Sequence, residues 1–529
     1  MLITEILRQN ARLFAQESAL ISIPAADQST SANNACSDIR REITWQEFDE
    51  QANQVANYYN SIGIGRGNKI GIIMMNCLEW LPIYFGVMRS GAVVVPLNYR
   101  YQAKDIIRSS HFVKLDALIF DEKSMAEVVG GLTELSRIRS FIFVGPKEHC
   151  PPFASLYSGT FGLSPVSDPG NQILAGDDAA IYFSSGTTGV PKAVVYTHRT
   201  LELACLQEQR NHEQVKKDCF ILIPPLYHVG AKIHWLGNLL TGARCVLLLG
   251  FNVKSFFRVV SEEKVTLAFL LLPWVQDIFL AIDDKNLSLE SYDLSSLRMI
   301  HLGAQPIPPC VVRRLMELFP SLDFDISYGL TESGGPGCLD LGKKNLNKIG
   351  SVGRPTAGWR AKIVDENGNE TKTGTPGELL LKGEGIMNRY FGDVESTARA
   401  ITDGWLRTGD IAVKDNDDFY SIVDRKKNII ISGGENIYPV PIEDFIREHA
   451  LVKDAAVFGI SSRRLGEAAI AVVELVPGAV CTEAEMKTFC LGLPRFERPK
   501  RFYFGEIPRN PTGKIDKVAL RNRYSNEKL

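Results

Sequence analysis

The sequence lacks several features that would assign it to a narrow class of protein. It contains no run of about eighteen apolar residues, so we do not expect a membrane-spanning helix. The formal net charge is only −2, which offers no electrostatic reason to expect a nucleic acid or an anionic membrane as partner. We therefore expect a globular protein that neither crosses a membrane nor binds nucleic acid.

The cysteines and histidines lack the spacings of metal sites and disulfide frameworks. The ten cysteines include no Cys-x-x-Cys pair, and the eight histidines include no His-Glu-x-x-His motif. A structural or catalytic transition-metal site is therefore not expected. Scattered thiols suit a reducing compartment, and the N-terminus has no apolar core of a signal peptide, so we expect a cytoplasmic protein.

Length and apolar pattern together predict an α/β fold. The chain has 529 residues, too many for one ordinary core, so two or more domains are expected. Short apolar runs separated by segments long enough for helices are typical of parallel sheets buried on both faces. The runs fall into two blocks: KIGIIMMN, GAVVVPL, DALIFD and FIFVG, and then FILIPP, ARCVLLL, VTLAFLLLP and MIHLGA.

The remaining stretches complete the predicted organisation. Residues 1–20 are expected to form an amphipathic surface helix, and residues 23–41 an exposed loop. After about residue 343, glycines and turn signals predict short strands joined by tight turns. We predict a large N-terminal domain over residues 1–424, with two α/β sheet subdomains and a small β-rich subdomain. A small, mobile α+β C-terminal domain is predicted over residues 425–529.

One loop has the composition of a phosphate-binding site. In YFSSGTTGVPKAV (residues 182–194), glycines allow close backbone approach, hydroxyls donate hydrogen bonds, and a lysine supplies a positive charge. The loop is not a Walker A motif, because it contains neither GKS nor GKT. A plain polar turn after a strand remains an alternative. The candidate phosphate ligands are Ser184, Ser185, Gly186, Thr187, Thr188, Gly189 and Lys192.

This loop is similar to the phosphate loop of the adenylate-forming superfamily, which includes acyl-CoA synthetases, luciferases and peptide-synthetase adenylation domains. Five further stretches resemble motifs of that superfamily in the expected order. They are LGAQP (302–306), SYGLTES (327–333), GWLRTGD (404–410), VDRKKNIIISGGENIYP (423–439) and PRNPTGKIDK (508–517). The chain is identified as a member because six ordered motifs span most of its length.

The resemblance implies a role for each motif. Glu332 would bind Mg²⁺ beside the phosphates of ATP, since a hard cation prefers oxygen ligands. Lys514 would offset the repulsion between a substrate carboxylate and the α-phosphate. Taken singly, each of these side chains also suits an ordinary solvated loop. Tyr328 would stack on the adenine, Asp410 would accept hydrogen bonds from the ribose hydroxyls, and Arg425 would assist at the ribose or a phosphate. The remaining candidate nucleotide contacts are Gly303, Ala304, Gln305, Gly329 and Thr331.

The resemblance also implies that the C-terminal domain reorients about Asp424 between two half-reactions. It would first present Lys514 and then present Gly433, Gly434 and Glu435 to the thiol of CoA. The two glycines would leave room for a narrow pantetheine arm. A tight turn after a strand is the alternative for this segment.

The stretch PPLYHVGAKIHW (224–235) resembles the segment that borders the acyl site. His228 is placed in the catalytic site as a packed pocket residue rather than an acid–base group. The stretch contains no aspartate to hold an ammonium group, which disfavours an α-amino acid substrate. Tyr227, Val229 and Trp274 would line an apolar pocket unless they are core residues. We expect a hydrophobic monocarboxylic acid: a medium- or long-chain fatty acid first, an aryl or alicyclic acid second.

The sequence therefore predicts an AMP-forming acid–CoA ligase that uses ATP, Mg²⁺ and CoA, with a homodimer left open. One alternative is an enzyme that loads the phosphopantetheine of a carrier protein. Another is a nucleotide-binding regulator that has lost catalysis. The presence of Glu332, Asp410 and Lys514 argues against such a loss.

Overall fold

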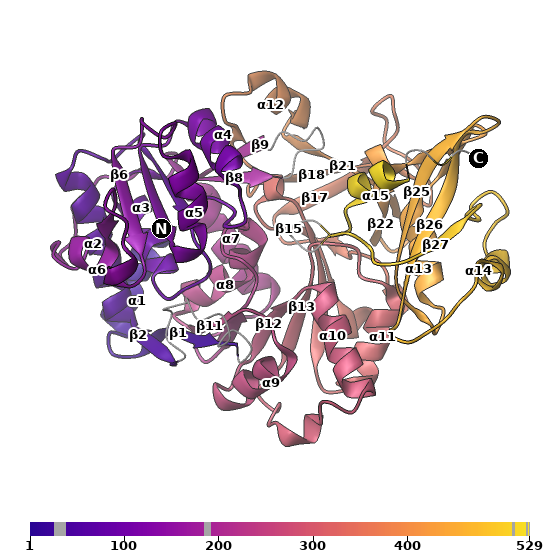
Figure 1. Ribbon diagram of the computed structural model, residues 1–529, viewed down its shortest axis with the longest axis horizontal. Coiled ribbons are helices and arrows are strands. Elements are labelled where there is room, and N and C mark those ends of the chain that lie inside the picture. The colour runs from indigo at the N-terminus through magenta and orange to yellow at the C-terminus, as the bar shows by residue number, and fades with distance from the viewer. Residues whose placement is uncertain (26–38, 185–191, 510–513, 525–526, 528–529) are drawn as a thin grey trace.

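The apolar runs of the sequence form strands of two large sheets, as the α/β pattern predicts. The computed structural model describes residues 1–25, 39–184, 192–509, 514–524 and 527. In Figure 1 the two sheets occupy the indigo-to-salmon part of the chain, and the orange-to-yellow C-terminal domain lies at the right.

The first sheet is mostly parallel. Its strands follow the order β19 (Arg389–Tyr390), β9 (Lys192–Thr197), β8 (Asp178–Ser184), β4 (Val93–Pro96), β3 (Lys69–Ile73), β5 (Ala117–Asp121), β6 (Ser140–Val144) and β7 (Ser155–Leu156). The helices in this part of the chain are α2 (Trp45–Ser61), α3 (Trp80–Arg89), α4 (Ala103–Val113), α5 (Glu122–Gly131) and α6 (Tyr157–Thr160).

The second sheet holds the second block of apolar runs. Its order is β16 (Arg354–Pro355), β15 (Pro336–Leu341), β14 (Asp323–Gly329), β13 (Met299–Gly303), β12 (Leu267–Leu270), β10 (Cys219–Leu222), β11 (Arg244–Leu249), β1 (Ser18–Pro24) and β2 (Arg41–Thr44). The accompanying helices are α1 (Ile3–Leu13), α7 (His198–Asn211), α8 (Val229–Thr241), α9 (Val253–Glu262), α10 (Leu272–Asp283) and α11 (Pro309–Leu318).

Alternation along the buried strands builds a layered core. Successive side chains of a strand point to opposite faces, so one strand serves two apolar clusters. In β10, Phe220 and Leu222 pack into the cluster between the two sheets, whereas Ile221 packs into the cluster beneath α9, α10 and α11. Trp45, Trp80 and Trp235 are fully buried in the cluster between the sheets. Strands buried on both faces explain why the runs are almost continuously apolar.

The glycine-rich region forms the β-rich subdomain that the turn signals predict. Its sheet has the order β17 (Trp359–Val364), β18 (Gly377–Gly383), β21 (Trp405–Lys414) and β20 (Ile401–Thr402), and β22 (Tyr420–Arg425) pairs with β21. The helix α12 (Val394–Ala400) precedes β20.

The C-terminal domain is α+β, as expected. Its sheet has the order β24 (Glu435–Ile437), β23 (Ile430–Ser432), β26 (Gly466–Leu475) and β25 (Val452–Ser462), and β27 (Phe502–Phe504) pairs with β26. Its helices are α13 (Pro439–Arg447), α14 (Glu483–Phe489) and α15 (Lys517–Arg523). Its separate apolar cluster includes Ile442, Val457 and Met486. The domain boundary between residues 424 and 425 stays a prediction.

The N-terminal segment differs from its prediction. Helix α1 ends at Leu13, and residues 18–24, expected as helix and loop, form strand β1. This strand pairs in parallel with β11 and antiparallel with β2, and its central residues are buried. Hydrogen bonds to two neighbouring strands outweigh the local helical spacing. The spacing could not indicate this, because both partner strands come from elsewhere in the chain. The first residues thus join the second sheet, so the two blocks are not strictly consecutive. The expected loop residues 26–38 lie outside the described residues.

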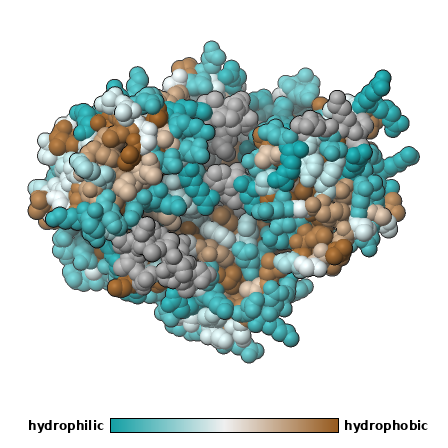
Figure 2. Space-filling view, viewed as in Figure 1, coloured by the Kyte–Doolittle hydropathy of each residue, from teal (hydrophilic) through white to brown (hydrophobic). Residues whose placement is uncertain are grey.

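Within the described ranges, no helix is both long enough and apolar enough to cross a membrane. Figure 2 shows teal hydrophilic residues over much of the face in view, with separate brown areas among them. The large exposed apolar side chains are spread along the chain, from Leu13 and Leu163 to Val394 and Val480.

Packing of α2 against α3 supplies a test of this core. A Cβ atom at Gly86 would lie 2.5 Å from Cβ of Val55 and 2.6 Å from the backbone oxygen of Ala52. Backbone cannot move aside without separating the helices, so we expect Gly86→Ala to destabilise the protein by about 1–3 kcal/mol. Thermal unfolding followed by circular dichroism measures the effect. Gly159→Ala is the control, because its new Cβ would meet no atom within 4 Å. Equal melting temperatures for the two variants would contradict this packing.

Candidate functional site

A buried carboxylate lies where the β-rich subdomain meets the second sheet. Asp410 lies in β21, opposite Arg425 of β22, and Tyr328 reaches it from β14. The Tyr328 hydroxyl donates to Asp410 Oδ2 at 2.6 Å, and Arg425 Nε lies 3.0 Å from Asp410 Oδ1. Burial raises the pKa of Asp410, while the Arg425 charge acts against that rise. The three side chains, predicted separately from three motifs, therefore meet at one point.

A second carboxylate lies at the end of β8, where the phosphate loop begins. Glu332 belongs to a short 3₁₀ turn, Thr331–Ser333. Its Oε1 accepts from the Ser184 hydroxyl at 3.2 Å and from the Tyr390 hydroxyl at 2.9 Å. Lys192 Nζ lies 4.5 Å from the centre of the Tyr390 ring. One described end of the predicted loop thus contacts Glu332 directly, and the other lies over the ring of Tyr390, which also contacts Glu332. Its central members, Ser185, Gly186, Thr187, Thr188 and Gly189, lie outside the described residues.

The predicted adenine segment begins where β13 ends. A Cβ atom at Gly303 would lie 2.7 Å from Ser327 Oγ and 2.8 Å from the Ser327 backbone oxygen, so a larger residue does not fit. Ala304 follows with φ at 66°, a left-handed conformation that is uncommon outside glycine. Ala304 is exposed and Gln305 half-buried. Gly329 ends the neighbouring strand β14, so the predicted adenine and ribose contacts share one sheet edge.

Lys514 joins these groups from the C-terminal domain. Burial and the Arg425 charge lower the pKa of Lys514 to about 8, while Asp410 and Glu332 act in the opposite direction. Lys514 also acts on His228, whose pKa its charge lowers. The charge of Lys514 thus acts on groups that the sequence assigns to the nucleotide and acyl sites. That the C-terminal domain presents Lys514 to the reactants stays a prediction.

The segment that carries Lys514 is anchored by a second lysine. Lys517 begins α15, and its Nζ lies 2.7 Å from Glu443 Oε1 and 3.6 Å from Asp424 Oδ2. Although burial opposes its charge, the two carboxylates raise the pKa of Lys517. Asp424 also accepts from Asn428 Nδ2 at 2.9 Å. The predicted hinge residue is thus tied to the helix that follows the catalytic candidate.

His228 lies immediately before α8, at the position that caps this helix. Its ring lies 4.1 Å from that of Tyr227, and the Tyr227 ring lies 5.8 Å from that of Tyr99. Burial, with the charges of Lys514 and Lys232, lowers the pKa of His228 to about 3. The imidazole is therefore neutral at ordinary pH. Val229 belongs to the cluster between the sheets, while Trp274 stacks on Phe251 and packs against the other cluster, so these two belong to different apolar groups.

One buried lysine near His228 was not anticipated from the sequence. Lys232 lies one helical turn beyond His228 and donates to the backbone oxygens of Leu226 and, at 3.2 Å, of His228. Its Nζ lies 4.7 Å from the Tyr182 ring centre and 5.0 Å from that of Trp80. Burial lowers the pKa of Lys232 well below its ordinary value. Carbonyls and aromatic faces stabilise this group, and neither leaves a recognisable sequence signal.

The predicted CoA-contacting glycines form the turn of the β23–β24 hairpin. Gly433 and Gly434 have φ of 61° and 87°, which a two-residue hairpin turn with positive φ at both positions requires. The Gly433 amide donates to the Leu465 backbone oxygen at 2.8 Å, and Glu435 is exposed. The hairpin thus packs within its own domain, while the charge of Lys514 from the same domain acts on residues that are predicted to contact the nucleotide.

Comparison with known proteins gives the class of this chain. Residues 23–391 match the family model of the AMP-binding enzymes, and residues 441–514 match the model of the AMP-binding enzyme C-terminal domain. The chain therefore belongs to the AMP-binding enzyme family, and its resemblance to the adenylate-forming superfamily is confirmed.

Two curated relatives and one solved structure illustrate this membership. The long-chain-fatty-acid–CoA ligase FadD13 of Mycobacterium tuberculosis is 28% identical, over 91% of this chain and 93% of the relative. 4-coumarate–CoA ligase 1 of Solanum tuberosum is 30% identical, over 92% and 89%. The anthranilate CoA ligase AuaEII, solved with anthranoyl-AMP, superimposes with a TM-score of 0.88 over 99% of this chain and 98% of that one; at 23% identity it supports the fold alone.

The contacts of Asp410 predict how this family's nucleotide binds. If its charge accepts the ribose hydroxyls, Asp410→Asn should weaken AMP binding by about tenfold or more, because charge-assisted hydrogen bonds are the stronger ones. Isothermal titration calorimetry measures the affinity. Asp418→Asn is the matched control, since it removes the same charge from an exposed position between the same two strands. AMP affinity that is unchanged in Asp410→Asn would contradict the assignment.

Proposed function

We propose that the protein is an ATP-dependent carboxylic acid–CoA ligase. The acid carboxylate attacks the α-phosphorus of ATP, giving an acyl-adenylate and pyrophosphate. The CoA thiol then attacks the acyl carbon, giving a thioester and AMP. The observation that carries the proposal is that Lys514 interacts electrostatically with Asp410, Glu332 and His228, which come from three different parts of the N-terminal domain.

In the first step, Lys514 places a positive charge where the two anionic reactants meet. It offsets their repulsion and stabilises the charge that develops in the transition state. Partial burial strengthens this effect, because less water screens the charge. Asp410 holds the ribose, and Arg425 keeps Asp410 oriented through their 3.0 Å contact.

Glu332 is the residue that would hold Mg²⁺. One carboxylate with the hydroxyls of Ser184 and Tyr390 beside it fits an ion that prefers oxygen ligands and takes its remaining ones from phosphates and water. When bound, the ion would offset negative charge on the phosphates. The two hydroxyls hold the carboxylate toward the end of the phosphate loop, and Lys192 adds a positive charge nearby.

In the second step, the C-terminal domain would turn about Asp424 and replace Lys514 by the β23–β24 hairpin. Gly433 and Gly434 are suited to this position because an exposed hairpin tip without side chains allows a pantetheine arm to pass closely. The contacts of Lys517 with Asp424 and Glu443 would anchor α15 to the turning domain.

For the acid, we propose a hydrophobic monocarboxylic acid, with a medium- or long-chain fatty acid preferred over an aryl or alicyclic one. The neutral His228, the aromatic contacts of Tyr227 and the apolar surroundings of Val229 support an uncharged acyl group. The relatives named above are ligases for a long-chain fatty acid and for 4-coumarate, so both classes belong in the assay panel.

Transfer to a carrier-protein phosphopantetheine is the second candidate function. AMP release that requires CoA and needs no carrier protein separates the two. A nucleotide-binding regulator is a more distant alternative, and pyrophosphate exchange that depends on the acid would exclude it.

The two half-reactions should respond to different substitutions. We expect Lys514→Ala to lower acid-dependent ATP–pyrophosphate exchange by about a hundredfold or more, since it removes transition-state stabilisation. It should leave thioester formation from supplied acyl-adenylate largely intact. Gly434→Leu should have the opposite pattern, because bulk and strain arise at the hairpin that faces the thiol.

Matched controls come from the same domain. Lys500→Ala removes an exposed lysine, and Gly478→Leu alters a glycine with φ of 79° and no atom near its Cβ position. Equal loss of both half-reactions in either test variant would count against separate roles for Lys514 and Gly434.

The charge of Lys514 also predicts a pH dependence. A lysine with a pKa of about 8 is positive below that pH and loses its charge above it. Since kcat/KM reports groups of the free enzyme, kcat/KM for adenylate formation should fall as the pH rises through about 8. Lys514→Arg stays charged and should lose this alkaline fall. A wild-type profile that remains flat well above pH 8 would reject the role.

A further inference from the structure

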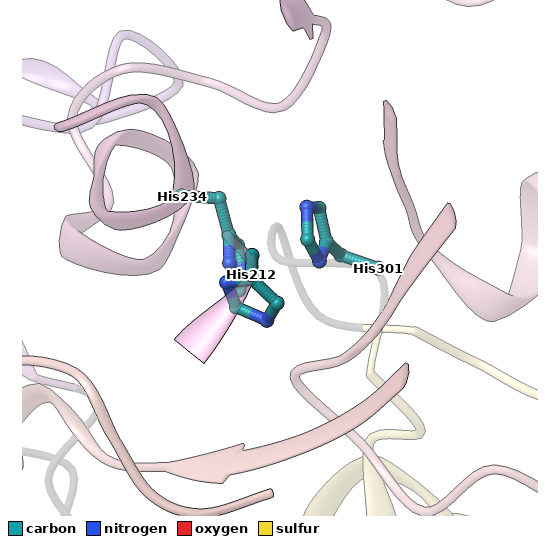
Figure 3. Close-up of side chains that lie close together, drawn as sticks. All are labelled: His212, His234 and His301. Carbon is teal, nitrogen blue, oxygen red and sulfur yellow. The ribbon is translucent and has the colours of Figure 1, made fainter. Parts of the chain in front are cut away.

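Three histidines far apart in the sequence converge in the interior, away from the residues assigned to acid activation. His212 follows α7, His234 lies in α8, and His301 lies in β13. Figure 3 shows the three side chains pointing toward one another. Their imidazoles are almost completely buried, and one ring nitrogen from each lies within 4.8 Å of the others.

Two buried carboxylates alternate with the three imidazoles. Glu208 Oε2 lies 3.0 Å from His212 Nδ1 and 3.0 Å from His234 Nδ1. Asp325 Oδ2 lies 2.9 Å from His212 Nε2 and also contacts His301 Nδ1. Both carboxylates are fully buried. The cluster therefore contains five potential metal ligands from α7, the α7 end, α8, β13 and β14.

Burial makes the charge of this cluster costly. Glu208 and Asp325 are fully buried, and an ionised group that is buried needs a compensating charge nearby. One divalent cation would balance two carboxylates with all three imidazoles neutral.

The contacts also show which ring nitrogens could face an ion. The Nδ1 atoms of His234 and His301 form hydrogen bonds with Glu208 Oε2 and Asp325 Oδ2, which leaves the Nε2 atoms of these two rings as candidate ligands. Among the described residues, His301 Nε2, Glu208 Oε1 and Asp325 Oδ1 have no hydrogen-bond partner. A carboxylate that holds the far nitrogen of a metal-binding imidazole is a common arrangement around an ion.

We propose that His212, His234 and His301, with Glu208 and Asp325, bind one divalent transition-metal ion. Zn²⁺ suits this donor set best, because imidazole nitrogen and carboxylate oxygen are among its ordinary ligands. The separation of up to 4.8 Å is wider than on a tetrahedral ion, so side-chain rotation draws the rings together on binding. The site is separate from Glu332, which suits Mg²⁺.

The role of such an ion would be structural. His301 lies two residues before Gly303, and Asp325 lies three before Tyr328, so the ion would join the strands that lead to the predicted adenine and ribose contacts. It would also tie these strands to α7 and α8. Because the site is closed, metal binding is linked to folding, and the ion would enter as the chain folds. The sequence offered no sign of this site, since its five ligands share no motif.

Metal analysis of the purified full-length protein tests the proposal. The chain is expressed without a polyhistidine tag in Zn²⁺-supplemented medium, purified by gel filtration and analysed by mass spectrometry for bound metal. We expect about one Zn²⁺ per chain in the wild type, and at least a fivefold lower content in His234→Gln and in His301→Gln. Expression with Co²⁺ should give visible d–d absorption that both variants lose.

His198→Gln is the matched control. His198 is a buried histidine in α7, the helix that carries Glu208, and it lies outside the cluster. It should keep the metal. Circular dichroism establishes that each variant is folded. If both variants fail to fold, the zinc content and the cobalt spectrum of the wild type decide whether the cluster binds a metal ion. A wild type that remains metal-free after expression with Zn²⁺ and Co²⁺ would overturn the proposal. Zinc that the folded His234→Gln and His301→Gln variants retain would overturn it as well.

Discussion

Repulsion between a carboxylate and a triphosphate is the physical constraint on which the proposed active site depends. Asp410 and Glu332 add negative charge of their own, so the site needs a cation that lies close without blocking the substrates. In the proposed mechanism, Lys514 would meet this need from the C-terminal domain. If that domain turns, it would remove the charge after the first step, when the acyl-adenylate must become accessible to a thiol.

The carboxylates of the site are held by donors from other elements, which fixes their orientation before substrate arrives. Asp410 of β21 receives Tyr328 of β14 and lies against Arg425 of β22. Glu332 receives Ser184 of β8 and the hydroxyl of Tyr390. Such preorganisation lowers the cost of ordering at the moment of reaction. It also means that both sheets and the β-rich subdomain must be packed before the site exists.

Strand β14 connects this site to the buried cluster of histidines. Asp325 faces His212 and His301, and three residues later Tyr328 reaches Asp410. One buried carboxylate, Asp325, therefore lies on β14 itself, and a second, Asp410 of β21, contacts the same strand through Tyr328. Burying an ionised group without a partner is costly, so each carboxylate lies beside groups that offset its charge.

The local sequence determined the strands, since runs such as FILIPP are apolar on both faces. It also determined the motifs, because the glycines, lysines and carboxylates of each motif are close together in the sequence. It did not determine strand β1, whose ladder partner β11 lies more than two hundred residues away. It also did not reveal that Lys232 is buried among aromatic rings, or that His212, His234 and His301 lie close together. Those arrangements depend on which elements become neighbours when the sheets pack, and burial then changes the charge and the partners of side chains that look ordinary in the sequence.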